Sequence, residues 1–107
     1  MKKHILCIGD SNTHGYCADP GDCADHGIRF NEDERWTCRL QKSLGEDYLV
    51  TEEGLSGRTT SFPDPINENM DVLSYVYALL KSHEYIDLLI IMLGTNDSKQ
   101  RMGTTPF

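Results

Sequence analysis

The sequence predicts an α/β domain in which helices cover both faces of a parallel sheet. Three short apolar segments, in residues 4–10, 48–54 and 86–94, each run up to a glycine. Two segments with the apolar spacing of helices lie between them. This alternation of strand and helix is typical of parallel sheets joined by right-handed crossovers.

The three strands are predicted from their apolar runs. The first, "HILCIGD", is rich in aliphatic residues and stops at Gly9, as expected for a buried strand that ends in a turn. The second is "YLVTEEG". The third, "IDLLIIMLG", is a continuous apolar run, which is typical of a parallel strand covered on both faces. Ligands bind beyond the carboxyl ends of such strands, so we expect the glycine-bearing turns to form the site.

Two helices are predicted between the strands. In the first, Trp36, Leu40 and Leu44 recur at every fourth position. Gly45 follows them, where glycine is favoured as a helix C-cap. The second helix is expected over residues 69–83, from Asn69 to His83, because its apolar residues follow the i, i+3, i+4, i+7 rule.

Length and composition limit the class of protein. With 107 residues and 38% hydrophobic content, the chain suffices for one small domain, expected over residues 1–107. A formal net charge of −7 without a basic cluster argues against nucleic acid and anionic membranes as partners. No apolar run reaches the ~18 residues of a membrane span. The first residues do not form a signal peptide, so we expect a cytoplasmic protein.

The chain has four cysteines: Cys7, Cys17, Cys23 and Cys38. We expect reduced thiols because no secretion signal is present. Two of them lie with His26 in segment 17–35, which is polar and is predicted to be a long loop. A zinc site there would need a fourth ligand and tighter spacing. The loop also lacks the alternating acidic residues of an EF-hand, so we expect neither metal nor cofactor.

Ser11 is the candidate nucleophile. It lies in "GDSNTHG", at a strand-to-helix turn where helix N–H groups favour negative charge, and Asp10 before it can hold the turn. Taken alone, "GDS" is better explained by a serine at a helix N-cap. Two further turns supply oxyanion donors: Gly57 through its backbone and Asn96 through its side-chain amide. Convergence of the three would make a nucleophile with an oxyanion hole.

The three turns resemble sequence blocks of a known superfamily. "GDSN", "GLSGRTT" and "MLGTND" are similar to the first three blocks of the SGNH or GDSL hydrolases. "ERWT", "EEGLSGRTT" and "IDLLIIMLGTND" resemble the arylesterase and acyltransferase branch, and the resemblance covers essentially the whole chain. It implies a flavodoxin-like three-layer α/β/α fold, truncated here to about three strands and two main helices. It also implies a serine esterase that acts on short-chain acyl esters through an acyl-enzyme.

The resemblance implies a role for each motif residue. Ser11 is the nucleophile and, through its own N–H, an oxyanion donor. Gly57 is the second donor, by its backbone, and Asn96 is the third, by its side chain. Asp97 anchors the loop that carries Asn96. Asn12 stands where many relatives carry leucine, which leaves the shape of the pocket open.

The general base is missing from the sequence. The family's fourth block, an Asp-x-x-His segment near the end of a chain roughly twice as long, has no counterpart here. His14 is three residues after Ser11, but adjacent turns of one helix rarely give the geometry of a base. We expect His14 to line the pocket, with the role of base as the alternative. His4 and His83 are expected at the opposite pole of the sheet.

Without the family's last strands, segment 86–94 becomes an edge. A flat apolar edge is a template for pairing with another chain, and the missing helices leave an apolar patch. We therefore expect either a fragment of a longer protein, whose base lies beyond Phe107, or a homo-oligomer that associates through the third strand.

Two other functions compete with the esterase, whose partner is a small-molecule ester. In the first, the oxyanion pocket persists as a non-catalytic remnant that holds a small anion such as a carboxylate. In the second, the topology alone suggests a flavodoxin-like mononucleotide binder. The chain lacks the Gly-rich phosphate loop that such a binder needs, because "GDSNTHG" matches neither of its forms.

Overall fold

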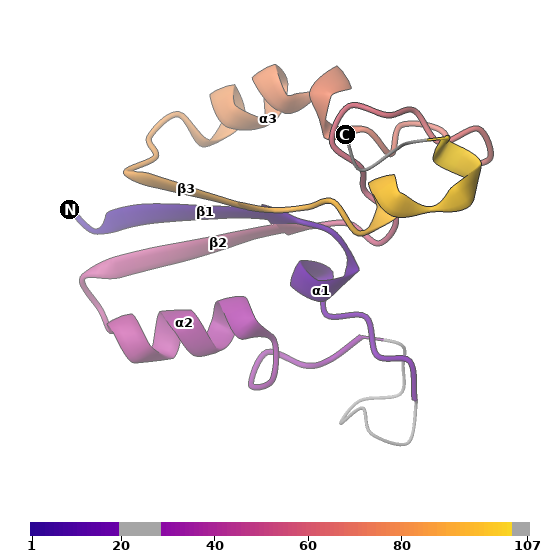
Figure 1. Ribbon diagram of the computed structural model, residues 1–107. Coiled ribbons are helices and arrows are strands. Elements are labelled where there is room, and N and C mark those ends of the chain that lie inside the picture. Colours follow the sequence, from indigo (N-terminus) through magenta and orange to yellow (C-terminus); the bar gives the residue numbers. More distant parts are fainter. Residues whose placement is uncertain (20–28, 104–107) are drawn as a thin grey trace.

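The protein is described by a computed structural model that covers residues 1–19 and 29–103 (Figure 1). A parallel sheet in the order β2-β1-β3 forms its centre. Its strands are β1 (Lys3–Gly9), β2 (Tyr48–Gly54) and β3 (Leu88–Met92). The helices are α1 (Ser11–His14), α2 (Trp36–Leu44) and α3 (Val76–His83), and short 3-10 turns are η2 (Val72–Ser74), η3 (Asn96–Ser98) and η4 (Gln100–Met102).

The predicted α/β architecture is confirmed. Helices α1 and α2 lie on one face of the sheet and α3 lies on the other (Figure 1). The three strands and the two longer helices occur in the predicted order. None of the described helices is long and apolar enough to cross a membrane.

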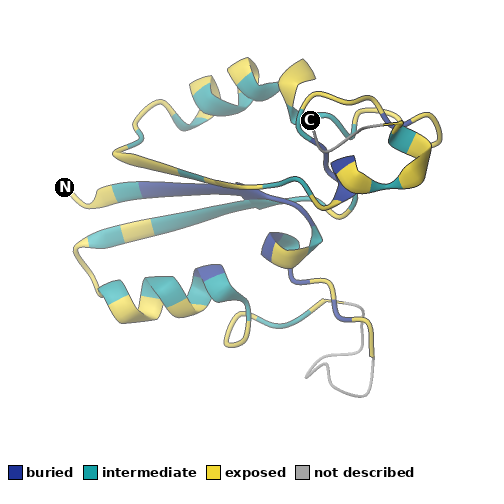
Figure 2. Cartoon of the chain, in the orientation of Figure 1, coloured by how far each residue is buried: buried dark blue, intermediate teal, exposed yellow. Residues whose placement is uncertain are grey.

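Strand β1 forms the core because it is paired on both sides and covered on both faces (Figure 2). Four successive residues, from Ile5 to Ile8, are at most 6% exposed. Each large aliphatic side chain buried in this way contributes roughly 1.5–3 kcal/mol to stability. Burial, together with the charge of Glu52, raises the pKa of the Cys7 thiol within this strand, so Cys7 is a structural thiol.

The second predicted helix begins later than the apolar spacing indicated. Asn69, its expected start, adopts a left-handed conformation with φ of 60°. The next residues bond instead to the loop after β2: Thr59 N–H donates to the Met70 carbonyl (2.9 Å), and Val72 N–H donates to the Thr59 carbonyl (3.0 Å). Only after η2 does α3 begin, at Val76. Apolar spacing does not report such long-range backbone bonds, so the prediction was wrong at this end.

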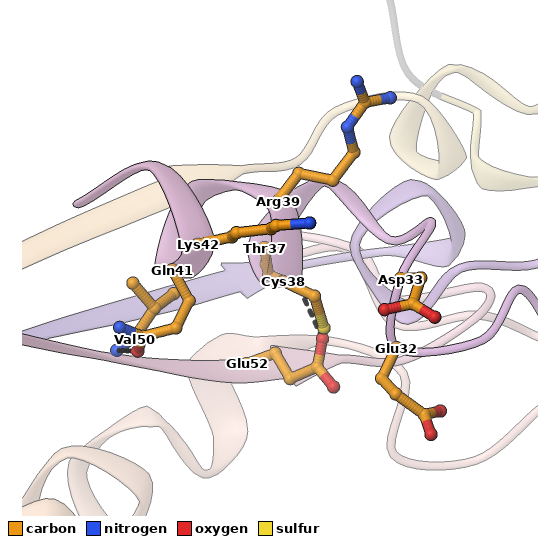
Figure 3. A pocket seen from close by; sticks show the side chains of 9 residues that line it. All are labelled: Glu32, Asp33, Thr37, Cys38, Arg39, Gln41, Lys42, Val50 and Glu52. Carbon is orange, nitrogen blue, oxygen red and sulfur yellow. Dashed lines mark hydrogen bonds between the residues drawn. The ribbon is translucent and has the colours of Figure 1, made fainter. Parts of the chain in front are cut away.

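The two edges of the sheet differ in their protection. At the β2 edge, the Gln41 side chain from α2 acts in place of a neighbouring strand (Figure 3): it accepts from Val50 N–H (2.7 Å) and donates to the Tyr48 carbonyl (2.8 Å). Strand β3 forms the other edge, as the sequence predicted. Its residues Leu88 and Ile91 are 51% and 58% exposed, so apolar side chains on both faces of this strand meet solvent.

The described part of the long loop is tied to β2 by one carboxylate. Arg35 donates to both oxygens of Glu52, at 2.8 and 3.1 Å, and Thr37 donates to the same group at 2.5 Å. Burial raises the pKa of the Glu52 carboxyl, but the Thr37 and Arg35 hydrogen bonds and the charges of Arg35 and Arg29 outweigh burial. They hold this pKa below its ordinary value.

The expectation of four reduced thiols is wrong at Cys17, which is disulfide-bonded, whereas Cys7 and Cys38 are free. The expectation rested on the cellular compartment, but the bond depends on whether folding brings two sulfurs within bonding distance. A disulfide sulfur is not a thiolate and does not ligate zinc, so the alternative zinc site loses one ligand. Its other two predicted ligands, Cys23 and His26, lie outside the described residues.

The disulfide also bears on the predicted location. Disulfides are rare in cytosolic proteins, so the cytoplasmic location stays a prediction.

We expect Glu52→Gln to lower the free energy of unfolding at pH 7 by about 2 kcal/mol, because it removes charged hydrogen bonds from Arg35 and Thr37. The folded-state pKa of Glu52 lies below its unfolded value. Its contribution is therefore complete above about pH 4.3, the ordinary value for glutamate, and is lost as the pH falls through the folded value. Urea unfolding between pH 7 and pH 3 should show a weaker pH dependence in the variant.

Glu34→Gln is the matched control for this experiment, because Glu34 is an exposed acid in the same loop. It should change the unfolding free energy by less than about 0.5 kcal/mol. Equal pH dependences for the wild type and Glu52→Gln would contradict the assignment.

Candidate active site

Ser11 opens α1 directly after the central strand. Asp10, 2% exposed, caps this turn: its carboxylate accepts from Asn12 N–H (3.1 Å) and its carbonyl from His14 N–H (2.9 Å). Gly15, with φ of 95°, ends the turn and donates to the Ser11 carbonyl (2.8 Å). Within the described residues, the hydroxyl and the N–H of Ser11 have no hydrogen-bond partner, so both are available to a ligand.

Helix α1 lies directly against the ends of β1 and β2 because both strands end in glycine. A Cβ at Gly9 would overlap the Thr13 side chain, and a Cβ at Gly54 would overlap the backbone of His14. Thr13 is fully buried between them and accepts a hydrogen bond from the Trp36 indole (3.2 Å). The glycines that mark the strand ends in the sequence are thus required by the close approach of α1.

Gly57 lies in the turn that follows β2. Its φ of 89° is in the left-handed region, which glycine adopts without strain. The turn is closed by a hydrogen bond from Arg58 N–H to the Leu55 carbonyl (3.1 Å). A side chain at Gly57 would also come within 3.3 Å of the Met70 sulfur, so the position is limited in space as well as in conformation.

Asn96 opens η3 beyond β3 and contacts the Gly57 turn. Its side chain is buried, and Nδ2 donates to the Arg58 carbonyl at 3.1 Å. The neighbouring Asp97 is also buried and accepts from Thr60 N–H (3.0 Å) and Thr60 Oγ1 (2.6 Å). Two adjacent residues after β3 therefore hold the loop after β2, and one amide hydrogen of Asn96 remains free for a ligand.

The strand register places Ser11 at the same end of the sheet as this pair of loops. Gly9 is paired with both Gly54 and Met92, so the three strands end at one level. Ser11, Gly57 and Asn96 follow that level by two, three and four residues respectively. The three positions that the sequence singled out thus lie at the carboxyl end of the sheet, where ligands bind in parallel α/β proteins.

Arg58, within the motif "GLSGRTT", has a role that the motif itself did not predict. Its guanidinium is buried and donates to the Tyr75 hydroxyl (2.8 Å) and to the carbonyls of Glu53 (2.5 Å) and Gly9 (3.4 Å). It also lies over the Tyr75 ring, 5.4 Å from the centroid. In the sequence, the one local signal of these contacts is an arginine within a motif of otherwise small residues.

None of the three described histidines bonds to Ser11. The Nδ1 atom of His14 lies 3.3 Å from the Gly54 carbonyl, and a neutral ring held in this way keeps Nε2 as its acceptor. His4 packs edge-on against Tyr85, with ring centroids 5.8 Å apart. His83 ends α3 and pairs with the Glu53 carboxylate at 3.1 Å.

A separate groove of about 630 Å³ lies between α2 and β2 (Figure 3). It contains none of the predicted site residues. Its lining residues are Glu32, Asp33, Thr37, Cys38, Arg39, Gln41, Lys42, Val50 and Glu52. Among residues 1–19 and 29–103, no group of three or more His, Cys, Asp or Glu side chains is placed to hold a metal ion.

Comparisons with known proteins show the family and the fold of this chain. The model of the GDSL-like lipase/acylhydrolase family matches residues 7–107. The chain is similar to the native aryl esterase of M. smegmatis, with 47% identity and a TM-score of 0.87 over 97% of this chain and 47% of that chain. It is also similar to Est24, a carbohydrate acetylesterase from Sinorhizobium meliloti, with 41% identity and a TM-score of 0.89 over 98% and 48%.

The chain therefore spans about half the length of these solved structures. No curated protein matches it.

Gly54→Ala is expected to be strongly destabilising, by about 3 kcal/mol, because the added methyl group would collide with the backbone of α1. Gly45→Ala is the control: Gly45, unlike Gly54, has a positive φ, of 83°, but its Cβ would meet nothing within 4 Å. The control should cost only about 1 kcal/mol of backbone strain. Chemical denaturation of both variants tests the difference, and equal losses would contradict the close-approach explanation.

Proposed function

Because the chain belongs to the GDSL-like lipase/acylhydrolase family, we propose that it carries the nucleophile and the oxyanion hole of a serine esterase. Ser11 is the nucleophile. The oxyanion donors are the N–H of Ser11, the N–H of Gly57 and the side-chain amide of Asn96. The observation that carries this proposal is the hydrogen bond from Asn96 to the Arg58 carbonyl, which brings the second and third motif turns together at the strand end where Ser11 lies.

The proposed reaction proceeds through an acyl-enzyme. Ser11 Oγ attacks the ester carbonyl carbon while a base removes its proton, and the three donors stabilise the oxyanion of the tetrahedral intermediate. The C–O bond to the alcohol then breaks, and the alcohol leaves with the proton from the base. The base then takes a proton from water, or from another acceptor, as it attacks the acyl carbon. The bond to Ser11 Oγ breaks, the base returns the proton to Ser11 Oγ, and the acid or the new ester is released.

The proposed substrates are esters with a short acyl group. The similar structures are those of an aryl esterase and a carbohydrate acetylesterase, which favours acetyl esters of aromatic alcohols or of sugars. Ser11 is only half-buried, so an ester carbonyl can reach it from solvent.

We propose that the base belongs to further polypeptide that covers β3 in the active enzyme. The chain spans about half the length of its solved relatives, and the apolar edge at β3 is the surface on which more sheet could be added. The other edge is closed by Gln41. His14 is the alternative base, because its Nε2 is not used by the contact with Gly54.

A non-catalytic anion site is the competing function, since the same donors would hold a carboxylate. Covalent reaction separates the two, because anion binding alone does not activate the Ser11 hydroxyl.

With the polypeptide that covers β3 present to supply the base, Ser11→Ala is expected to abolish the hydrolysis of p-nitrophenyl acetate, and wild-type Ser11 is expected to react covalently with an organophosphonate. Hydrolysis by residues 1–107 alone would instead indicate His14 as the base. A stopped spectrophotometric assay and intact-protein mass spectrometry measure the two effects. Ser98→Ala, an exposed serine of η3, is the control and should retain activity and labelling. Equal hydrolysis by wild type and Ser11→Ala, together with no labelling, would favour the anion site.

We expect the isolated 107-residue chain to self-associate through β3, and Ile91→Lys to shift it toward monomer by placing a charge on the exposed apolar edge. Leu49→Lys is the control, because Leu49 is an exposed apolar residue of β2, 39% exposed, and Gln41 already closes the edge of that strand. Sedimentation equilibrium measures both variants. A compact monomer of the wild-type chain would exclude self-association at β3.

A further inference from the structure

We propose that Arg58 is a positioning residue that holds Ser11, Gly57 and Asn96 in one fixed arrangement. This inference rests on the proposed esterase function, because positioning has meaning only if those three residues act together. The role proposed for Arg58 is exerted through its contacts to other parts of the chain, so it is a positioning role and not a catalytic one.

The guanidinium joins the ends of two strands. Its Nη1 donates to the carbonyl of Glu53 on β2 at 2.5 Å and to the carbonyl of Gly9 on β1 at 3.4 Å. Gly9 lies two residues before Ser11. The turn that carries the nucleophile is therefore linked to the strand that leads to Gly57 through one side chain.

The backbone of the same residue joins the third strand end. The Arg58 carbonyl accepts the hydrogen bond from Asn96 Nδ2 at 3.1 Å. Arg58 also follows Gly57 directly, so a movement of Arg58 would move one oxyanion donor and lose the contact that orients the other. One residue is thus in contact with all three strand ends.

Tyr75, before α3, fixes the direction of the guanidinium. Its hydroxyl accepts from Arg58 Nε at 2.8 Å, and its ring lies beneath the group at 5.4 Å. The planar fork of arginine can serve these separate acceptors at once, whereas the ammonium of lysine is a single point charge. The contacts therefore require arginine rather than any cation.

The charge of Arg58 is unusual for a buried group. Arg58 is 5% exposed, and within the described residues it forms no salt bridge to a carboxylate. Its acceptors are two carbonyls and a hydroxyl, so the positive charge is solvated but not neutralised. A buried charge without a counter-ion is costly. Because the guanidinium lies at the strand ends, its positive charge stabilises the negative charge that develops on the oxyanion there during the reaction.

The test compares Arg58→Met, Arg58→Lys and Tyr75→Phe with Arg39→Met, a matched control on an exposed arginine of α2. The first readout is the rate of Ser11 phosphonylation, with kcat and KM for p-nitrophenyl acetate, measured with the polypeptide that covers β3 present. The second is the position of the Asn96 side-chain amide resonances in a ¹⁵N–¹H correlation spectrum, which does not depend on activity. Urea unfolding identifies variants that do not fold.

We expect Arg58→Met to lower kcat and the phosphonylation rate by roughly 100-fold, because small misplacements of reacting groups have effects of this size. KM should change by less than about threefold. Arg58→Lys should resemble Arg58→Met, and the milder Tyr75→Phe, which keeps the ring and the carbonyl contacts, should lower kcat by about threefold. The Asn96 amide resonances should move in the Arg58 variants and stay in place in Arg39→Met.

Wild-type rates in Arg58→Lys would overturn the proposal, because charge alone would then suffice. Unmoved Asn96 resonances in a folded Arg58 variant would overturn it as well. If Arg58→Met does not fold, the rates of Tyr75→Phe decide. Rates equal to those of the wild type would then count against the proposal. If the wild-type protein, with the polypeptide that covers β3 present, neither hydrolyses the ester nor reacts with the phosphonate, the proposed function fails instead. The Asn96 resonances alone then decide whether Arg58 holds the strand ends.

Discussion

The close packing of α1 on the ends of β1 and β2 is the constraint on which the rest of the structure depends. Gly9 and Gly54 leave room for Thr13 and the backbone of His14, and the buried Asp10 caps the turn between strand and helix. A side chain at either glycine would displace the helix from the sheet. The position of Ser11 therefore follows from contacts of its neighbours, and among the described residues its own hydroxyl and N–H are left without partners.

The same end of the sheet is held by polar groups that satisfy one another. Asn96 bonds to Arg58, and Asp97 bonds to Thr60, so the loops after β2 and β3 form one unit. Among the described residues, no buried side-chain nitrogen or oxygen lacks a hydrogen-bond partner. Such fully bonded networks are rigid, and rigid donors suit the stabilisation of a developing charge because they need little reorganisation.

The two edges of the sheet differ in whether they can pair with another polypeptide. Gln41 satisfies the backbone of β2 and blocks pairing there, whereas β3 has the composition of an interior strand and the position of an edge strand. The apolar side chains of β3 are exposed on both faces. This asymmetry, together with a length about half that of the solved relatives, supports further polypeptide at β3 as the source of the base.

The sequence by itself determined the class of fold, the order of strands and helices, and the three motif turns at one end of the sheet. These features depend on apolar spacing and motif order, which are local along the chain. Only the tertiary structure decided where α3 begins, because backbone bonds between Thr59 and residues 70–72 replace the first helical turns expected after Asn69. The disulfide at Cys17 and the roles of Gln41 and Arg58 were likewise decided there. Each of these features depends on atoms that strand register and loop packing bring together. The spacing of residues in the sequence does not report such contacts.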